Sequence, residues 1–201
     1  YDNMGVTLKD QGKLDDAIEA HRKSILLKPS RAEAHSNLGN TLKEQGRLDQ
    51  AIENYNNSIS LKPDYADAYF NMGVALKNQG KLDESIEAYK KCISIKPNDA
   101  EAYDNMGVTL KDQGKLDDAI AAYQKSISLK PNYAEVHNDL GVVFQAQGKC
   151  DEAIKAYDKA ILLKNNFAEA FNNKGALLQE LGEFDKATDA LNKSIILKPD
   201  Y

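Results

Sequence analysis

Apolar residues recur along the chain with the spacing of helices, and residues 100–133 show the pattern clearly. The first stripe is spaced i, i+3, i+4 and i+7, as on one face of an amphipathic helix: Tyr103, Met106, Gly107 and Leu110. A second stripe follows a polar interval: Ala119, Ile120, Tyr123, Ile127 and Leu129. We therefore predict one helix over about residues 100–113 and a second ending near Lys130, because Pro131 cannot continue a helix.

The polar interval Gln113-Gly114-Lys115 predicts a turn between the two helices. Gly114 can adopt the positive φ that often follows the end of a helix. Asp117 stands where a side-chain oxygen can cap the second helix, and we expect it to do so. Residues 100–133 are thus predicted to form a helical hairpin.

The hairpin pattern repeats every 34 residues along the whole chain. Two glycines recur in every copy: Gly5, Gly39, Gly73, Gly107, Gly141 and Gly175, then Gly12, Gly46, Gly80, Gly114, Gly148 and Gly182. The six units are 1–31, which lacks its first three residues, 32–65, 66–99, 100–133, 134–167 and 168–201. A hairpin this short falls below the roughly 40 residues that usually fold alone, so neighbouring units must stack. We predict a single array over 1–201 and interpret it as a fragment of a longer protein.

The repeated residues resemble the tetratricopeptide repeat (TPR) pattern, with tyrosine in place of its usual tryptophan. The match in the type unit consists of Tyr103-x-x-Met106-Gly107-x-x-Leu110, Ala119-x-x-x-Tyr123 and Pro131. The resemblance covers all six units. It implies an all-α fold, a right-handed α-solenoid in which first helices line a concave groove and second helices lie outside. It also implies binding as the mechanism, because TPR arrays serve as adaptors, scaffolds and docking arms.

Small residues in the pattern predict close contacts between helices. A glycine inside a helix costs about 1 kcal/mol relative to alanine, yet one recurs at the place of Gly107 in every unit. We expect the small residues Gly107, Ala119 and Ser126 to let two helices approach, with the Tyr123 ring beside them.

A column of asparagines runs along the predicted groove face: Asn3, Asn37, Asn71, Asn105 and Asn173, with Asp139 in the fifth unit. Asparagine is a poor helix former and caps nothing in a helix interior. Its carboxamide has a donor and an acceptor, so the column could pair with the backbone of an extended peptide. The alternative is duplication without use, since residues 1–18 are identical to residues 103–120.

This column resembles the asparagine ladder in the TPR arm of O-linked N-acetylglucosamine transferases, from which Asp139 departs. Five further groove residues complete the predicted peptide-binding set: Asn40, Lys43, Lys77, Lys111 and Asp112. The lysines have a second explanation, because cations are favoured by the helix dipole in a last turn.

We predict a non-catalytic scaffold that binds an extended peptide or protein segment in its groove. Two alternatives stay open. The array could self-associate weakly, head to tail, through ends that lack a polar capping helix. It could also be the substrate-docking arm of a transferase whose catalytic domain lies outside this chain.

Composition and charge exclude several other partners. The net charge is −5 and no basic cluster occurs, which argues against nucleic acid. No apolar run approaches the roughly 20 residues of a membrane span, and no signal-like segment opens the chain, so we expect a cytoplasmic location and no membrane partner. A chaperone C-terminal tail is disfavoured, because acids occupy the places where a lysine would clamp its carboxylate: Glu33, Asp67 and Glu101.

The sequence offers no catalytic constellation, and we predict no catalytic residue, no cofactor and no metal site. His21, His35 and His137 take aromatic places in their units, so we expect them to pack. Cys92 and Cys150 lack the spacing of a disulfide framework or zinc site and are expected to be small packed side chains. The sixth unit departs most from the pattern, with Lys174 in the place of Met106 and Leu191 in that of Tyr123.

Overall fold

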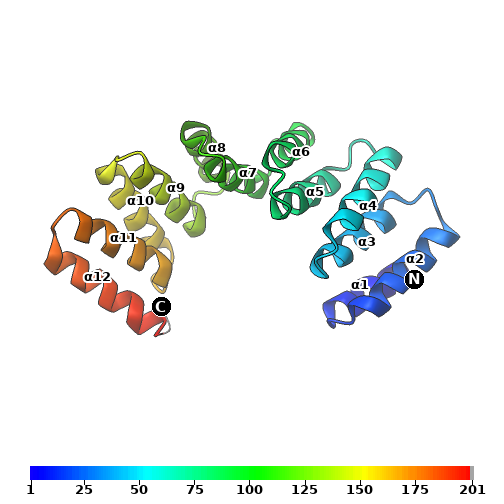
Figure 1. Ribbon diagram of the computed structural model, residues 1–201, viewed down its shortest axis with the longest axis horizontal. Helices are drawn as coiled ribbons and strands as arrows, with labels where there is room; N and C mark the ends of the chain where they lie inside the picture. Colours follow the sequence, from blue (N-terminus) through cyan, green and yellow to red (C-terminus); the bar gives the residue numbers. More distant parts are fainter. Residues whose placement is uncertain (200–201) are drawn as a thin grey trace. The chain divides into compact units, whose positions relative to one another are not determined.

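The computed structural model describes residues 1–199, which contain twelve α-helices and no strand (Figure 1). The helices are α1 (Asp2–Asp10), α2 (Leu14–Leu27), α3 (Ala32–Glu44), α4 (Leu48–Leu61), α5 (Ala66–Asn78), α6 (Leu82–Ile95), α7 (Ala100–Asp112), α8 (Leu116–Leu129), α9 (Ala134–Ala146), α10 (Cys150–Leu163), α11 (Ala168–Glu180) and α12 (Phe184–Leu197). The predicted all-α series of helical hairpins is confirmed. No helix among these is both long and apolar enough to cross a membrane.

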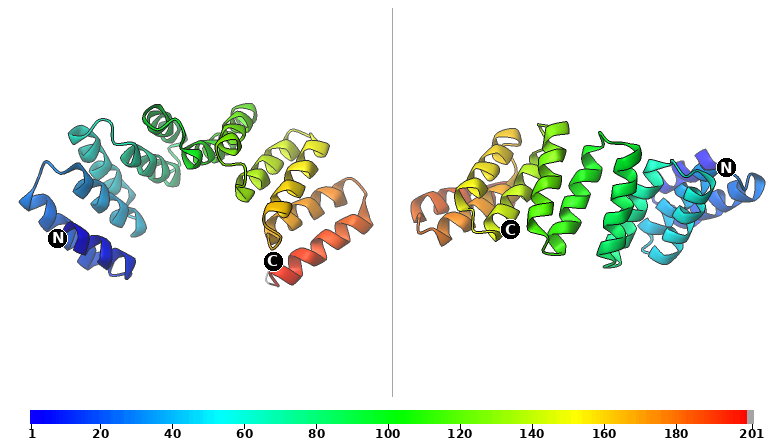
Figure 2. Two further views of the ribbon diagram at one scale, coloured as in Figure 1. Left: turned by 180° about the vertical axis from the view of Figure 1, so that it is seen from behind. Right: turned by 90° about the horizontal axis from the view of Figure 1, so that it is seen from above.

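The chain divides into two compact units, Tyr1–Asn98 and Asp99–Tyr201, here called the N-terminal and C-terminal units. Each contains three hairpins that stack in chain order (Figure 2). Within a unit, the first helix of a later hairpin contacts its own second helix and both helices of the hairpin before it. Helix α9, for example, packs on α10, α8 and α7. Stacking therefore buries the open side of one hairpin against the next, as the length argument requires.

The type unit forms two helices close to their predicted bounds, Ala100–Asp112 and Leu116–Leu129. Gly114 has a φ of +76°, so the predicted glycine turn is confirmed. The predicted cap is wrong. Lys115 occupies the N-cap of α8 without a side-chain cap, and Asp117 Oδ1 instead accepts a hydrogen bond from Gln147 Nε2 at 2.8 Å.

The Gln147 contact joins one hairpin to the next and recurs in the N-terminal unit. Gln45 donates to Asp15 and Gln79 donates to Asp49, each with 2.8 Å between Nε2 and Oδ1. An acid in the first turn of a second helix therefore serves as an acceptor between hairpins, which the sequence reasoning missed.

Close packing of Gly107 against Tyr123 is confirmed. A Cβ atom built on Gly107 would lie 2.7 Å from Cε1 of Tyr123, whose side chain is completely buried. His21 takes the same place against Gly5, as predicted, and is also completely buried. In the sixth unit Leu191 fills the place beside Gly175.

Other small residues carry hydrogen bonds as well as packing. The buried hydroxyl of Ser126 donates to the carbonyl oxygen of Ala100 at 2.8 Å, and Ser58 and Ser194 repeat the contact in their hairpins. In the sixth unit, the position of Met106 is occupied by Lys174, whose charged end makes a polar contact instead. Its Nζ lies 2.6 Å from Asp158 Oδ1 on the preceding hairpin, so an ion pair replaces the methionine contact.

Candidate functional site

All eleven side chains of the predicted peptide-binding set lie on first helices of the hairpins. The N-terminal unit contributes Asn3, Asn37, Asn40, Lys43, Asn71 and Lys77, from α1, α3 and α5. The C-terminal unit contributes Asn105, Lys111, Asp112, Asp139 and Asn173, from α7, α9 and α11. Asn3 and Asp112 are exposed, and the other nine are half-buried. Successive first helices are in contact within each unit. The predicted binding residues of one unit therefore lie on adjacent helices.

Two asparagines of the column use one amide hydrogen within their own helix. Asn71 Nδ2 donates to the carbonyl oxygen of Asp67 at 2.9 Å, and Asn105 Nδ2 donates to that of Glu101 at 3.0 Å. This contact fixes the orientation of each carboxamide. A carboxamide has two N–H donors and an acceptor oxygen, so each still has hydrogen-bonding capacity to offer.

Two other asparagines of the column bond to the preceding hairpin. Asn37 Nδ2 donates to Asp2 Oδ1 at 3.2 Å, and Asn173 Nδ2 donates to Asn138 Oδ1 at 3.0 Å. In both cases the acceptor belongs to the earlier hairpin, where it directly precedes that hairpin's own column residue. We call this acceptor position, together with the column position of the next hairpin, an inter-hairpin pair. The sequence reasoning missed the first member, although a polar residue such as Asp2 on an otherwise buried face was a usable signal.

Asp2 shows how a buried carboxylate is satisfied in an inter-hairpin pair. Its side chain is almost completely buried, and Oδ1 accepts from Asn37 and lies 3.1 Å from Nδ1 of His21. Its Oδ2 lies 3.2 Å from a guanidinium nitrogen of Arg31. Burial holds the pKa of His21 below its ordinary value, while the Asp2 carboxylate opposes this shift. Three groups of the chain therefore surround this one carboxylate.

The corresponding pair in the C-terminal unit has a different chemistry. Asp104 takes the place of Asp2, and Asp139 takes that of Asn37. Burial, followed by the charge of Asp139, raises the pKa of Asp104 to about 6, and a hydrogen bond from Tyr133 partly opposes the shift. The Oδ1 atom of Asp104 is buried without a hydrogen-bond partner. A second acid, Asp139, thus stands in the place where the N-terminal unit has Asn37.

The hydroxyl groups of the buried tyrosines depend on the residue opposite. Tyr55 donates to Asn40 Oδ1 and Tyr157 donates to Gln145 Oε1, both at 2.9 Å. In α7 the place of Asn40 is taken by Val108, which offers no acceptor, and the Tyr123 hydroxyl is buried without a partner. Burial, and then the charges of Asp139 and Asp104, raise the pKa of Tyr123.

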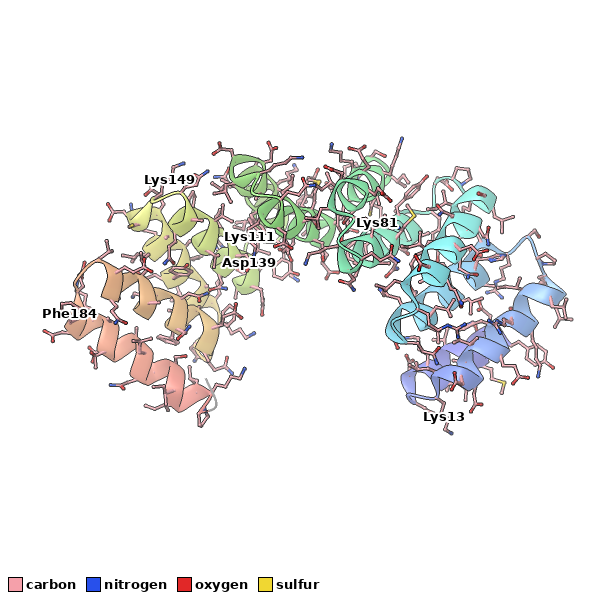
Figure 3. The ribbon with its side chains drawn as sticks, viewed as in Figure 1. Lys13, Lys81, Lys111, Asp139, Lys149 and Phe184 are labelled. Atoms are coloured by element: carbon pink, nitrogen blue, oxygen red, sulfur yellow. The ribbon has the colours of Figure 1, made fainter. Side chains whose placement is uncertain are left out.

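The lysine column also links hairpins. Lys9 Nζ lies 3.1 Å from Glu44 Oε1, and Lys43 Nζ donates to Asn71 Oδ1 at 3.0 Å. These contacts reach the next hairpin, so the helix dipole alone does not account for the column. Figure 3 labels Lys111 and Asp139, which belong to the neighbouring helices α7 and α9. Lys111 occupies the same position in its hairpin as Lys9. The position equivalent to Glu44 is Ala146 in α9, so the Lys9–Glu44 ion pair has no equivalent at Lys111.

Comparison with family models decides the classification. A model described as TPR repeat matches residues 5–46, 39–80, 109–148 and 146–182. Two further models, each described as tetratricopeptide repeat, match residues 66–99 and 168–201 and residues 88–121. The chain belongs to the TPR family. No curated protein matches the sequence.

Solved structures of other TPR-like chains share the fold. The structure of MamA has 28% identity and a TM-score of 0.76, and the match covers 81% of this chain and 95% of MamA. PilF of Pseudomonas aeruginosa has 20% identity and a TM-score of 0.85, with 100% and 91% covered. YrrB, described as a TPR protein with an unusual peptide-binding site, has 23% identity and a TM-score of 0.74, with 92% and 95% covered. At their low identity, PilF and YrrB show the fold alone.

The TPR motif explains the packing of each hairpin but leaves the inter-hairpin pairs free to vary. Motif residues such as Gly107 and Tyr123 lie in the contact between the two helices of a TPR. The pairs within the two units differ from hairpin to hairpin: Asp2 with Asn37, Ser36 with Asn71, Asp104 with Asp139, and Asn138 with Asn173. These places therefore distinguish one TPR of this chain from another.

Proposed function

We propose that this TPR chain is a non-catalytic scaffold that binds an extended peptide or protein segment along its first helices. The proposal rests on the side-chain carboxamides of Asn71 and Asn105, whose orientation is fixed by a hydrogen bond. Each donates one hydrogen to a carbonyl of its own helix, at 2.9 and 3.0 Å. A side chain that is already oriented loses less conformational entropy when a ligand binds.

An extended peptide suits this arrangement for a chemical reason. Its backbone offers alternating N–H and C=O groups, and a carboxamide can pair with both kinds. The half-buried state of both asparagines gives a contact that is partly shielded from water while remaining reachable. The description of YrrB as a peptide-binding TPR protein is consistent with this use of the fold. Head-to-tail association and the role of a transferase docking arm stay predictions.

The test replaces Asn71 and Asn105 together by alanine and measures the Kd for an extended peptide. We expect binding to weaken by about 0.5–1.5 kcal/mol per lost neutral hydrogen bond. Stability should change little, because alanine is the better helix former, while Asn71→Ala also removes the acceptor of the Lys43 hydrogen bond. Asn57→Ala, an exposed asparagine of the second helix α4, is the matched control and should bind normally.

Two results would count against this function. Equal Kd values for the parent and the double variant, across several extended peptides, would leave duplication as the origin of the column. A large loss of stability in the double variant would make the column structural. Replacing the peptide amides by N-methyl amides should weaken binding more than scrambling the peptide's side chains, because the proposed contacts are to its backbone.

A further inference from the structure

A cavity of about 430 Å³ lies between the second helices α4 and α6 of the N-terminal unit, over the first helix α5, which packs against both. We call it the α4–α6 pocket. Its lining consists of Ile52, Asn56, Tyr69, Met72, Leu76, Asp83, Glu84, Glu87, Ala88 and Lys91. None of these residues belongs to the predicted peptide-binding set, and those on α5 lie on a different face of that helix from Asn71. The pocket is therefore separate from the asparagine column.

The floor of the α4–α6 pocket is apolar and already formed. Ile52, Tyr69 and Met72 are half-buried, and Leu76 and Ala88 are buried. Ile52 and Met72 also pack against the hydrophobic core of the N-terminal unit, which holds them in place. A large apolar side chain that enters such a pocket gains free energy by leaving water, and the helices need not rearrange first.

The rim of the pocket carries more acids than bases. Helix α6 contributes Asp83, Glu84 and Glu87 from its first two turns, and Lys91 follows further along the same helix. Glu87 pairs with Lys90 at 2.8 Å and Asp83 also has a partner in the chain, whereas Glu84 is exposed and has no ion-pair partner within residues 1–199. A carboxylate can accept several hydrogen bonds, so the Glu84 side of the pocket favours a cationic group.

The sixth hairpin shows how a cation occupies the equivalent place. Seven equivalent positions, three repeats further along the chain, line a cavity of about 320 Å³: Phe171, Lys174, Leu178, Lys186, Asp189, Ala190 and Lys193. There Lys174 replaces Met72, and its Nζ lies 2.6 Å from Oδ1 of Asp158, which replaces Asn56 on the preceding second helix. An alkyl chain that ends in a cation thus lies beside an acid. In the third hairpin Met72 brings no charge, so a cation beside Glu84 has to come from a bound partner.

We propose that the α4–α6 pocket binds a large apolar side chain of a partner peptide that carries an arginine or a lysine directly beside it. The apolar side chain packs on Ile52 and Met72, and the cation pairs with Glu84 at the rim. The volume of the pocket falls in the range of ligand-binding cavities and leaves room for one large side chain together with part of its neighbour. The pocket is independent of the asparagine column, so it stands or falls separately from the proposed function.

The test titrates N-acetyl-phenylalanyl-arginine amide into the chain and follows its methyl-labelled methionines by NMR. The Met72 methyl should shift saturably, while Met106 of α7 serves as the internal reference and should shift less. Replacing the probe's arginine by its neutral isostere citrulline should weaken binding about two- to fivefold, as expected for an exposed ion pair. Replacing its phenylalanine by alanine should weaken binding by about tenfold or more, because most of the buried apolar surface is lost.

Two variants locate the cation. Glu84→Lys gives the third hairpin the residue that the sixth has at this position, Lys186, and should abolish the preference for arginine over citrulline. The control is Glu152→Lys, which makes the same charge change at the same position of the fifth hairpin and should keep the preference at Met72. In the parent chain the preference should also shrink at about 1 M salt, where exposed charges are screened.

Several outcomes would overturn the proposal. One is the lack of a saturable Met72 shift with the phenylalanine and arginine probe. Another is equal binding of the arginine and citrulline probes, or of the phenylalanine and alanine probes, by the parent chain. A Met72 signal that moves with protein concentration before any probe is added would identify a second copy of the chain as the occupant and would also overturn it.

Discussion

Gln147 of one hairpin donates from Nε2 to Oδ1 of Asp117 in the hairpin before it, over 2.8 Å. The same 2.8 Å contact joins Gln45 to Asp15 and Gln79 to Asp49. A hydrogen bond that recurs at three of the stacking steps ties the stability of one hairpin to that of its neighbour.

This link predicts a measurable coupling between hairpins. Gln147→Ala and Asp117→Ala should each lower the free energy of unfolding by about 0.5–1.5 kcal/mol, since a hydrogen bond is lost. The double variant should lose little more than either single variant, because both remove the same contact. Urea denaturation of the four chains measures the coupling. Strict additivity of the two losses would show that the bond contributes nothing.

The two glycines of a hairpin should respond to alanine for different reasons. At Gly107 a Cβ atom would lie 2.7 Å from the Tyr123 ring, so Gly107→Ala should overpack the contact and cost about 1–3 kcal/mol. At Gly114 nothing lies within 4 Å, but φ is +76°, so Gly114→Ala should cost about 1–2 kcal/mol through the backbone alone.

Asparagine separates these two causes by thermal denaturation. Gly114→Asn should be milder than Gly114→Ala, because asparagine tolerates a positive φ. Gly107→Asn should be worse than Gly107→Ala, since the larger side chain enters the same crowded space. The reverse order at either site would refute the corresponding explanation.

The hairpin period, the turn glycines and the Gly107 contact could be predicted because each depends on residues close in sequence. Helical spacing fixes the buried stripe, and a positive φ at Gly114 needs no distant partner. The contacts between hairpins could not be predicted in this way. Gln147 and Asp117 are 30 residues apart, and Asn37 and Asp2 are 35 apart, so their approach depends on how stacked helices are offset. Asp117 was thus expected to cap its own helix.

The Asp104 pKa of about 6 predicts an unusual pH dependence of stability. The ordinary value is 3.8, so between about pH 4 and 6 the folded chain holds a proton that the unfolded chain has lost. The free energy of unfolding should therefore fall as pH rises through this window, by an amount on the order of 2 kcal/mol. The groups that act on this carboxyl are Asp139, Tyr133, Glu101 and Glu135.

Asp104→Asn isolates this contribution from the other acids of the chain. The variant should be more stable than the parent at pH 7, and the difference should shrink toward pH 4 as Asp104 of the parent becomes protonated. Thermal denaturation of both chains across this range measures it. A difference between the chains that does not change with pH would show that Asp104 ionises normally.

Removing a tyrosine hydroxyl should have opposite effects in two neighbouring hairpins. Tyr157 donates to Gln145 Oε1 at 2.9 Å, so Tyr157→Phe should cost about 1 kcal/mol because a hydrogen bond is lost and its acceptor is left without that donor. The Tyr123 hydroxyl is buried without a partner, so Tyr123→Phe removes only a burial cost and should leave stability unchanged or raise it. Both rings are completely buried and face a glycine, which makes the two substitutions a matched pair. Urea denaturation at pH 7 compares them. Equal losses would mean that the Tyr123 hydroxyl has a partner in solution, and an ordered water molecule beside Asp104 would then be the first group to look for.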